Sequence, residues 1–361
     1  MKLTRRNFGV AGLAAASSAV AAPAIAQSAP TVNWRMVSSF PKSLDNFFNA
    51  CTTISRLVAE MSDKKFNIQV FAAGEIVPGL QVLDAVQNGT VESGHTYSGY
   101  YIGKDTSLIF DGSLPFGMTP RQHHAWLQFG GGQKLVDEVY DRHGVIAIPA
   151  GNTGAQMFGW FRKELKTVQD FQGLKMRVAG FGGRVLGKLG VVPQQIAAGD
   201  IYAALERGTL DAVEFVNAYD DEKLGFFKVA KYYYGPCIME LEANIPLIIG
   251  KNAWASIPPA YQTMLRTAAI YADVEMQAAS NAKNASAIKS VIAKGAQISW
   301  LTPEIVKALH TASEQVLDEE SGKNPNFAKV LTSWREFRAE QHRYFQIADA
   351  NAEMTVYAQR T

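Results

Sequence analysis

The sequence predicts an α/β protein of two lobes that ends in long helices. Three observations support this fold class. Strand-like and helix-like patterns alternate along the first two thirds of the chain, one helix-to-strand junction occurs twice, and long helical patterns take over from Pro258 onward. With 361 residues, of which 47% are hydrophobic, the chain is long enough to bury two separate cores.

The first unit runs strand, helix, strand. Residues Val32–Val37 and Phe66–Phe71 alternate apolar and polar side chains, as a strand with one buried face does. Between them, Leu44–Met61 carries apolar side chains at helical spacing: Leu44, Phe47, Phe48, Cys51, Ile54, Leu57, Val58 and Met61. This order predicts the βαβ unit of an α/β domain.

One junction occurs in each half of the chain. Residues 84–93 (DAVQNGTVES) and 203–212 (AALERGTLDA) share a helix end, Gly-Thr, an aliphatic residue, a carboxylate and a small residue. Gly89 stands where a glycine closes a helix. The two copies favour two lobes built on one plan, although any helix-glycine-strand junction looks similar. On this plan His95 and Glu214 occupy corresponding places near strands that line a ligand crevice.

The C-terminal third predicts three long helices, over Ala260–Lys294, Pro303–Glu320 and Pro325–Gln359. The last one mixes an apolar stripe with many charges. Such a stripe must cover either the chain's own lobes or a partner subunit, and its own lobes are the default expectation.

Residues 1–26 predict an export signal. A short basic start is followed by a weakly apolar stretch and by Ala24-Ile25-Ala26, which fits a cleavage signal. Thr4-Arg5-Arg6-Asn7-Phe8 fits the twin-arginine pattern for export of folded chains, and an ordinary secretory leader with a chance arginine pair is the alternative. We therefore expect a soluble periplasmic protein, since no later apolar run is long enough to span a membrane.

The net charge bears on the choice of partners, and the two cysteines bear on disulfide formation. Removing the leader takes away three basic and no acidic residues, so the formal charge changes from +2 to −1. A near-neutral chain without a basic run is not expected to bind nucleic acid. Cys51 and Cys237 are the only cysteines, and two separate buried thiols are favoured over a disulfide.

Four polar side chains interrupt apolar runs: Gln156, Arg177, Glu214 and Glu240. Buried charges need partners, so the four are expected to converge on one another or on a small anionic ligand. A structural ion pair between Arg177 and a glutamate is the alternative. Two glutamates beside one arginine and an anion would leave excess negative charge, and a hard cation held by carboxylate and amide oxygens would balance it. Familiar hydrolase, nucleotide and zinc motifs are missing from the sequence.

The mature chain resembles the periplasmic substrate-binding proteins of tripartite ATP-independent periplasmic (TRAP) transporters, of the DctP type. The segments that carry the resemblance are Ser38–Asp45, Gly74–Gly79, Gly151–Gln156, Gly173–Val178, Gly190–Pro193 and Gly208–Glu214. Tyr219–Lys228 is similar to the branch that binds 2-oxo and 2-hydroxy monocarboxylates such as pyruvate.

The resemblance implies a two-lobed, type II-like periplasmic binding fold with a hinge. Lobe I is expected to comprise 27–152 and a return segment, 241–280. Lobe II is expected to comprise 153–240 and, with the long C-terminal helices, 281–361. The branch also forms dimers through its final helix, so the resemblance implies a homodimer.

The resemblance also assigns roles to residues. Arg177 would clamp the ligand carboxylate, and a metal cation, Na⁺ or Ca²⁺, would be held by Gln156, Glu214, the main-chain carbonyl of Phe215, and Glu240. The full set expected to face the ligand is Arg177, Asn152, Gln156, Tyr100, Tyr101, Phe40 and Asn217.

Two departures from the family pattern concern the pocket wall. Phe215 stands where a tryptophan is expected, and Ile238–Glu242 replaces a segment like Trp-Trp-Glu-Gly-Gly. The loss of indoles favours a ligand other than pyruvate, such as a longer 2-oxoacid or lactate. Glu242 could also compete with Glu240 for the metal.

The predicted function is a non-catalytic receptor that delivers a small 2-oxo or 2-hydroxy monocarboxylate to the small and large membrane permease subunits. A metal-free receptor of the same fold for a dicarboxylate or sugar acid is the second hypothesis. A receptor coupled to a sensor remains open, and a periplasmic metal-dependent enzyme ranks last because no nucleophile or acid-base pair stands out.

Overall fold

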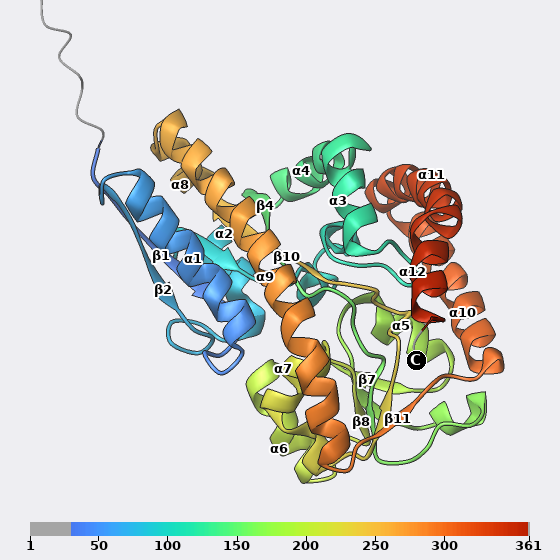
Figure 1. Cartoon of the computed structure of the whole chain (residues 1–361). Helices are drawn as coiled ribbons and strands as arrows, with labels where there is room; N and C mark the ends of the chain where they lie inside the picture. Colours follow the sequence, from blue (N-terminus) through green and yellow to red (C-terminus); the bar gives the residue numbers. More distant parts are fainter. Residues whose placement is uncertain (1–29, 360–361) are drawn as a thin grey trace, which may run out of the picture.

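Two β-sheets form the framework of the molecule (Figure 1). The computed structural model describes residues 30–359. The predicted export signal, 1–26, lies outside the described residues. The predicted α/β class with two lobes is confirmed, and each lobe has one of the two sheets at its centre.

Lobe I is built on a sheet of five strands in the order β2-β1-β3-β10-β4. Strand β1 is parallel to β2 and β3, whereas β10 is antiparallel to β3 and β4. The strands are β1 Val32–Ser38, β2 Phe66–Phe71, β3 Ser93–His95, β4 Val145–Asn152 and β10 Asn244–Gly250.

Lobe II is built on a sheet of six short strands in the order β11-β9-β5-β8-β6-β7. Strand β6 is parallel to both β7 and β8, whereas β5 is antiparallel to β8 and β9. The strands are β5 Gly159–Phe161, β6 Lys175–Arg177, β7 Val192–Gln194, β8 Ala212–Val213, β9 Tyr232–Tyr234 and β11 Gln297–Ser299.

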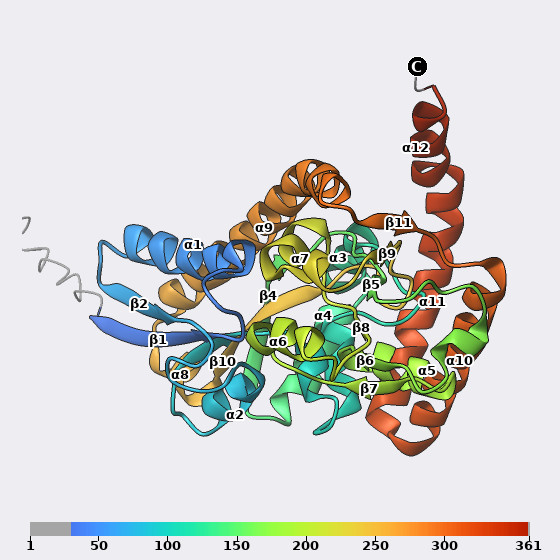
Figure 2. The same ribbon diagram turned by 90° about the horizontal axis from the view of Figure 1, so that it is seen from below.

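The α-helices of the described residues cover these sheets (Figure 2). They are α1 Asp45–Met61, α2 Val82–Gln87, α3 Pro120–Phe129, α4 Gly132–Asp141, α5 Gly180–Lys188, α6 Ile201–Glu206, α7 Ala218–Leu224, α8 Lys251–Ser256, α9 Pro259–Ala293, α10 Pro303–Lys323, α11 Pro325–Ile347 and α12 Asp349–Tyr357.

The first βαβ unit is confirmed. Helix α1 begins one residue later than predicted, after Leu44, and ends at Met61 as predicted. Its predicted apolar face is buried at Phe47, Ile54 and Val58, so this face packs into the core of lobe I. Strands β1 and β2 lie next to each other in parallel, as two strands joined by a crossover helix do.

The repeated junction has the same geometry in both lobes. Gly89 and Gly208 adopt left-handed φ values of 68° and 75°. After each glycine a threonine amide donates back to an alanine carbonyl of the helix: Thr90 to Ala85 at 2.9 Å and Thr209 to Ala204 at 3.0 Å. Each junction leads into a central strand, β3 in one sheet and β8 in the other. The prediction of one plan used twice is therefore confirmed at this level.

The chain crosses between the lobes in two loops, 153–158 and 235–243, and along helix α9. In Figure 1, α9 lies along α1 and then reaches α7. The loops support each other, because the Cys237 amide donates to the Gln156 carbonyl at 3.0 Å and the Thr153 amide to the Ala243 carbonyl at 3.1 Å. The predicted lobe boundaries at 152/153, 240/241 and 280/281 stay a prediction.

The C-terminal helices match the prediction with one correction. Helix α9 is within one residue of the predicted range at each end, and α10 runs three residues further than predicted. The single helix predicted over Pro325–Gln359 is broken at Ala348, where ψ is −82°, into α11 and α12. No residue of α12 is buried, and α12 projects from the body in Figure 2.

The two cysteines are separate buried thiols, as predicted. Within residues 30–359, no helix is long and apolar enough to cross a membrane.

Candidate functional site

Two of the four singled-out polar side chains come from neighbouring strand ends of lobe II. Arg177 is the last residue of β6, and Glu214 directly follows β8. The strands are parallel, and the Glu214 amide donates to the Arg177 carbonyl at 2.9 Å, which extends the ladder to these residues. Both side chains therefore lie at the carboxyl edge of the sheet, where ligands bind in open α/β folds.

The other two come from the loops between the lobes. Gln156 lies on the first crossing loop and Glu240 on the second. The side-chain Nε2 of Gln156 donates to Thr153 Oγ1 at 3.1 Å, which fixes the orientation of its amide. The four predicted residues are thus brought together at the junction of the two lobes.

A cavity lies between these elements. About 20 Å³ is open to the centre of a water molecule, room for about one ordered water. Walls from lobe I and lobe II meet there, so the cleft is closed in this structure. The lining residues are Phe40, Phe47, Tyr97, Tyr100, Thr153, Gln156, Arg177, Ala179, Phe215, Val216, Glu240, Ala243 and Ile245.

The Arg177 guanidinium is held by main-chain oxygens and not by a close salt bridge. Nη1 donates to the Glu214 carbonyl at 2.6 Å, and Nε donates to the Ile196 carbonyl at 3.3 Å. The ring of Phe215 packs 5.0 Å from the guanidinium carbon. These contacts fix a fully buried cation in one orientation, and the guanidinium also lines the cavity beside Tyr100.

Glu214 has no partner that satisfies its charge. Its carboxylate is 3% exposed, and neither oxygen accepts a hydrogen bond. The Arg177 Nη1 atom is 3.7 Å from Oε2, too far for a hydrogen bond. Burial, followed by repulsion from Glu240, raises the pKa of Glu214 well above its ordinary value, although Arg177 opposes the shift.

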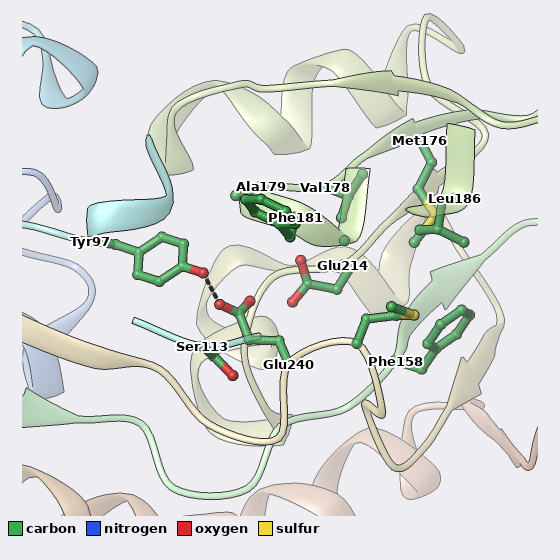
Figure 3. A pocket seen from close by; sticks show the side chains of 12 residues that line it. Tyr97, Ser113, Phe158, Met176, Val178, Ala179, Phe181, Leu186, Glu214 and Glu240 are labelled. Atoms are coloured by element: carbon green, nitrogen blue, oxygen red, sulfur yellow. Dashed lines mark hydrogen bonds between the residues drawn. The ribbon is translucent and has the colours of Figure 1, made fainter. Parts of the chain in front are cut away.

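Glu240 faces Glu214, as Figure 3 shows. The hydroxyl of Tyr97 donates a short hydrogen bond to Glu240 Oε1. Burial raises the pKa of Glu240 to about 8, despite the hydrogen bond from Tyr97 and the charge of Arg177. Two buried carboxyl groups side by side favour protonation or a bound cation.

The unpartnered oxygens fit a hard cation. Gln156 Oε1 also lacks a hydrogen-bond partner, as do both Glu214 oxygens. Gln156 and Glu240 line this cavity, and Glu214 meets Glu240 in a second cavity beside it. Carboxylate, amide and main-chain oxygens are the donors that Ca²⁺ and comparable ions take. Within residues 30–359, no group of three or more His, Cys, Asp or Glu side chains is arranged for a metal, so an amide and a carbonyl would have to complete the set.

A second cavity lies beside the carboxylates of Glu214 and Glu240 (Figure 3). About 10 Å³ is open there to the centre of a water molecule. Its walls away from the glutamates are mostly apolar: Phe158, Met176, Val178, Phe181, Leu186 and Met239. Met239 stands in the segment where bulky indoles were expected from the resemblance.

Three residues predicted to face the ligand are engaged elsewhere. Asn152 Nδ2 donates to Glu242 at 2.7 Å, and its Oδ1 accepts from the Gly154 amide. The Tyr101 hydroxyl bonds Thr96 Oγ1 at 2.6 Å. Asn217 caps α7 and donates to the Thr153 carbonyl at 3.1 Å. None of the three lines the cavity, whereas Phe40, Tyr100 and Phe215 do.

Glu242 lies outside the cavity. Its two oxygens accept from His123 Nδ1 at 2.7 Å and from Asn152 Nδ2, so both are already used. It is Glu240 that lies beside Glu214, and Glu242 supports the neighbouring network. His123 itself is buried, and Glu242 and the Phe110 carbonyl contact its two ring nitrogens.

Sequence reasoning missed several apolar and small wall residues, including Phe47, Thr153 and Ile245. Phe47 was recognised only as one of the apolar positions of α1. Its ring packs on Phe40 with centroids 4.1 Å apart, and a pair of aromatic residues flanking a helix start is the signal that could have identified it.

Comparison with known families decides the identity of the fold. The model of the bacterial extracellular solute-binding protein family 7 (DctP) matches residues 37–323. The chain belongs to this family. As a family 7 protein it is a TRAP solute-binding protein of the bacterial extracellular space, which agrees with the predicted export to the periplasm.

The relatives of this family 7 protein include a monocarboxylate 2-oxoacid-binding periplasmic protein of Nostoc, 46% identical over 86% of this chain and 85% of the relative. A similar solved structure is that of a TRAP solute-binding protein of Bordetella bronchiseptica, with a TM-score of 0.90 at 45% identity. The match covers 91% of this chain and 98% of that one. That structure is a mixed-occupancy dimer, with copurified calcium and picolinate bound in one active site and the other site apo. A TRAP solute-binding protein of Pseudoalteromonas atlantica, with bound sodium and pyruvate, has a TM-score of 0.87 at 34% identity, with coverage of 90% and 99%.

Proposed function

We propose that this family 7 protein captures a small 2-oxo or 2-hydroxy monocarboxylate together with a cation. The observation that carries the proposal is a buried arginine that lines a cavity between the two lobes together with Gln156, and that lies 3.7 Å from Glu214. Side-chain oxygens of both Gln156 and Glu214 lack partners. An anion on the arginine and a cation on the oxygens would satisfy every one of these groups. The 2-oxoacid-binding relative and the neighbours with calcium or sodium support this combination.

In this proposal Arg177 binds the ligand carboxylate through its planar fork, in the orientation that its main-chain contacts fix. Gln156, Glu214, Glu240 and the carbonyl of Phe215 hold Na⁺ or Ca²⁺, and the ligand completes the coordination of the ion. Phe40 and Tyr100 form the wall on the side of lobe I.

Asn152, Tyr101 and Asn217 act in this proposal by holding the cleft in shape. Their polar atoms are bonded to the protein, so a direct contact with the ligand would first have to break those bonds. We propose that their substitution alters closure more than it alters the choice of ligand.

We further propose that the protein is a receptor and not an enzyme, and that it hands its ligand to the small and large TRAP permease subunits. Pairing of two copies through α11 and α12 belongs to the same proposal. It is supported by Tyr344, Ile347, Met354 and Val356, which are apolar or aromatic and exposed on these helices, and by the dimer of the Bordetella relative.

Isothermal titration with pyruvate tests the proposed ligand. The protein is first unfolded and refolded in chelator, to remove copurified ligand and metal, and is then titrated with pyruvate, 2-oxobutyrate, lactate and succinate, each with Ca²⁺, Na⁺ or chelator. We expect the monocarboxylates to bind only with a cation.

Tight binding of succinate in chelator would support the metal-free dicarboxylate receptor and overturn our proposal. Mass spectrometry of the titrated mixtures supplies the check on catalysis, because a receptor returns its ligand unchanged and an enzyme gives a product.

A further inference from the structure

A group of charged and aromatic side chains joins the two lobes beside the cavity. Asp45, the first residue of α1, accepts hydrogen bonds at its Oδ2 from the Tyr219 hydroxyl at 2.8 Å and from Lys283 Nζ at 3.3 Å. Its Oδ1 pairs with Lys223 Nζ at 2.8 Å. We call Asp45, Tyr219, Lys223 and Lys283 the interlobe cluster.

The members of the cluster belong to different lobes. Asp45 is fixed to lobe I, because α1 packs on β1 and β2. Tyr219 and Lys223 lie on α7, which is anchored in lobe II: the buried Asp221 carboxylate accepts from Trp160 of β5 at 3.0 Å and from Tyr233 of β9 at 2.9 Å. Lys283 lies on α9, which contacts both α1 and α7. Figure 2 shows α1, α7 and α9 next to one another.

Residues close in sequence to the cluster line the cavity from both lobes. Phe47, two residues after Asp45, lines the cavity from lobe I, and Val216, three residues before Tyr219, lines it from lobe II. Opening the cleft would therefore pull Asp45 away from α7. The cluster also accounts for two sequence segments that the binding site leaves unexplained, the end of Ser38–Asp45 and the start of Tyr219–Lys228.

The two lysines of the interlobe cluster each contact both the Asp45 carboxylate and the Tyr219 ring. Lys223 and Lys283 lie on the Tyr219 ring, with Nζ 4.9 and 4.7 Å from its centroid, so the ring and Asp45 share two cations. Burial opposes the charge of Asp45, but hydrogen bonds from Lys223, Tyr219 and Lys283 outweigh it and hold the pKa of Asp45 near 2. The carboxylate is therefore ionised under physiological conditions, and it is only about one third exposed.

We propose that the interlobe cluster is a latch that stabilises the closed cleft and thereby sets the affinity for the ligand without touching it. This inference rests on the proposed function for its ligand but not for its geometry. A latch raises the population of the closed, binding-competent state, and apparent affinity scales with that population.

The test compares Asp45→Asn with Glu222→Gln in the full chain. Asp45→Asn keeps the shape of the side chain and removes the negative charge that forms ion pairs with Lys223 and Lys283. Glu222 is the matched control, because it lies on the same helix α7 and pairs with Lys294 and Ser290 of α9, without reaching α1. Tyr219→Phe, which removes one hydroxyl donor to Asp45, serves as a milder second variant.

We expect Asp45→Asn to weaken pyruvate binding in the presence of Ca²⁺ by about tenfold, mainly through faster dissociation, and Tyr219→Phe to weaken it by about threefold. Glu222→Gln should leave the Kd unchanged. An unchanged Kd for Asp45→Asn, or an equal loss in Glu222→Gln, would overturn the latch.

Small-angle X-ray scattering separates this inference from the proposed function. If wild-type protein binds no pyruvate with any cation, the proposed function fails, and the latch is then decided by the radius of gyration of the ligand-free proteins. Asp45→Asn should be more open than wild type. Equal radii in that case would overturn the latch.

Discussion

At the scale of single residues, the site combines one satisfied charge, that of Arg177, with one unsatisfied charge, that of Glu214. Arg177 has main-chain acceptors for its guanidinium, whereas Glu214 has none for its carboxylate. A purely structural ion pair would bring the two within hydrogen-bond distance, and their separation of 3.7 Å does not. The imbalance therefore favours a binding site over an ion pair made for stability.

The shape of the Arg177 head group should matter as well as its charge. Arg177→Lys keeps the cation and loses the planar fork, so we expect pyruvate to bind about 10- to 100-fold more weakly in titration calorimetry with Ca²⁺. Arg184→Lys is the control, since Arg184 pairs with Glu320 near the surface, away from the cavity. Equal affinity in Arg177→Lys and wild type would contradict the clamp.

We expect the Glu214 carboxyl group to destabilise the metal-free protein. Glu214→Gln removes a buried carboxyl group without a partner, and we expect the free energy of unfolding in chelator to rise by about 1–2 kcal/mol. The same variant should lose the stabilisation that Ca²⁺ gives to wild type. Urea melts with chelator and with Ca²⁺ measure both effects, and a variant that still gains stability from Ca²⁺ would show that Glu214 is not a ligand.

Glu240 contributes to the pH dependence of stability, together with the buried carboxyl groups of Asp111, Asp220 and Asp221, whose pKa values burial also raises. The pKa of Glu240 is raised from 4.5 to about 8 by burial, so the folded metal-free protein binds more protons than the unfolded chain between these values. The resulting stability is fully present below about pH 4.5 and is lost as the pH rises through about 8. The midpoint temperature of thermal unfolding in chelator should therefore fall as the pH rises over this range. The stabilisation by Ca²⁺ should grow over the same range, because the ion needs deprotonated carboxylates.

Glu240→Gln is the control for this pH dependence. The glutamine does not titrate, so its melts in chelator should fall less steeply between pH 5 and 8. The same slope in variant and wild type would assign the effect to other groups.

At the scale of elements, long periodic segments were predictable and local exceptions were not. The face of α1 and the cap at Gly89 follow from spacing and from glycine geometry. The break at Ala348 gave no signal, because alanine is the best helix former and the amide of Ala348 still donates to the Tyr344 carbonyl.

The same limit applies to the site. Arg177, Gln156, Glu214 and Glu240 were predicted to converge because each interrupts an apolar run. Asn217 also follows such a run, but it caps a helix. Sequence spacing alone does not distinguish a polar side chain that caps a helix from one that faces a ligand.

Helix α12 tests the proposed pairing of two copies. None of its residues is buried, so deleting 349–361 should remove little of the core and shift the thermal midpoint only slightly. We expect light scattering to show a dimer for the full chain and a monomer for the shortened one. A shortened chain that stays a dimer would move the interface elsewhere.

At the scale of the whole molecule, the structure is a closed cleft whose two halves meet at a buried group of charges. Both crossing loops contribute a polar residue to that group, and the interlobe cluster lies beside it. Ligand, cation and closure are therefore expected to depend on one another, since each supplies contacts that the others leave unsatisfied.

A crystal structure of the protein with Ca²⁺ and pyruvate tests the central claim most directly, because anomalous scattering locates the ion. Our account predicts the ion among oxygens of Gln156, Glu214, Phe215 and Glu240, with the pyruvate carboxylate on Arg177 and its 2-oxo oxygen on the ion. Pyruvate bound away from Arg177, or an ion bound without either glutamate, would contradict it.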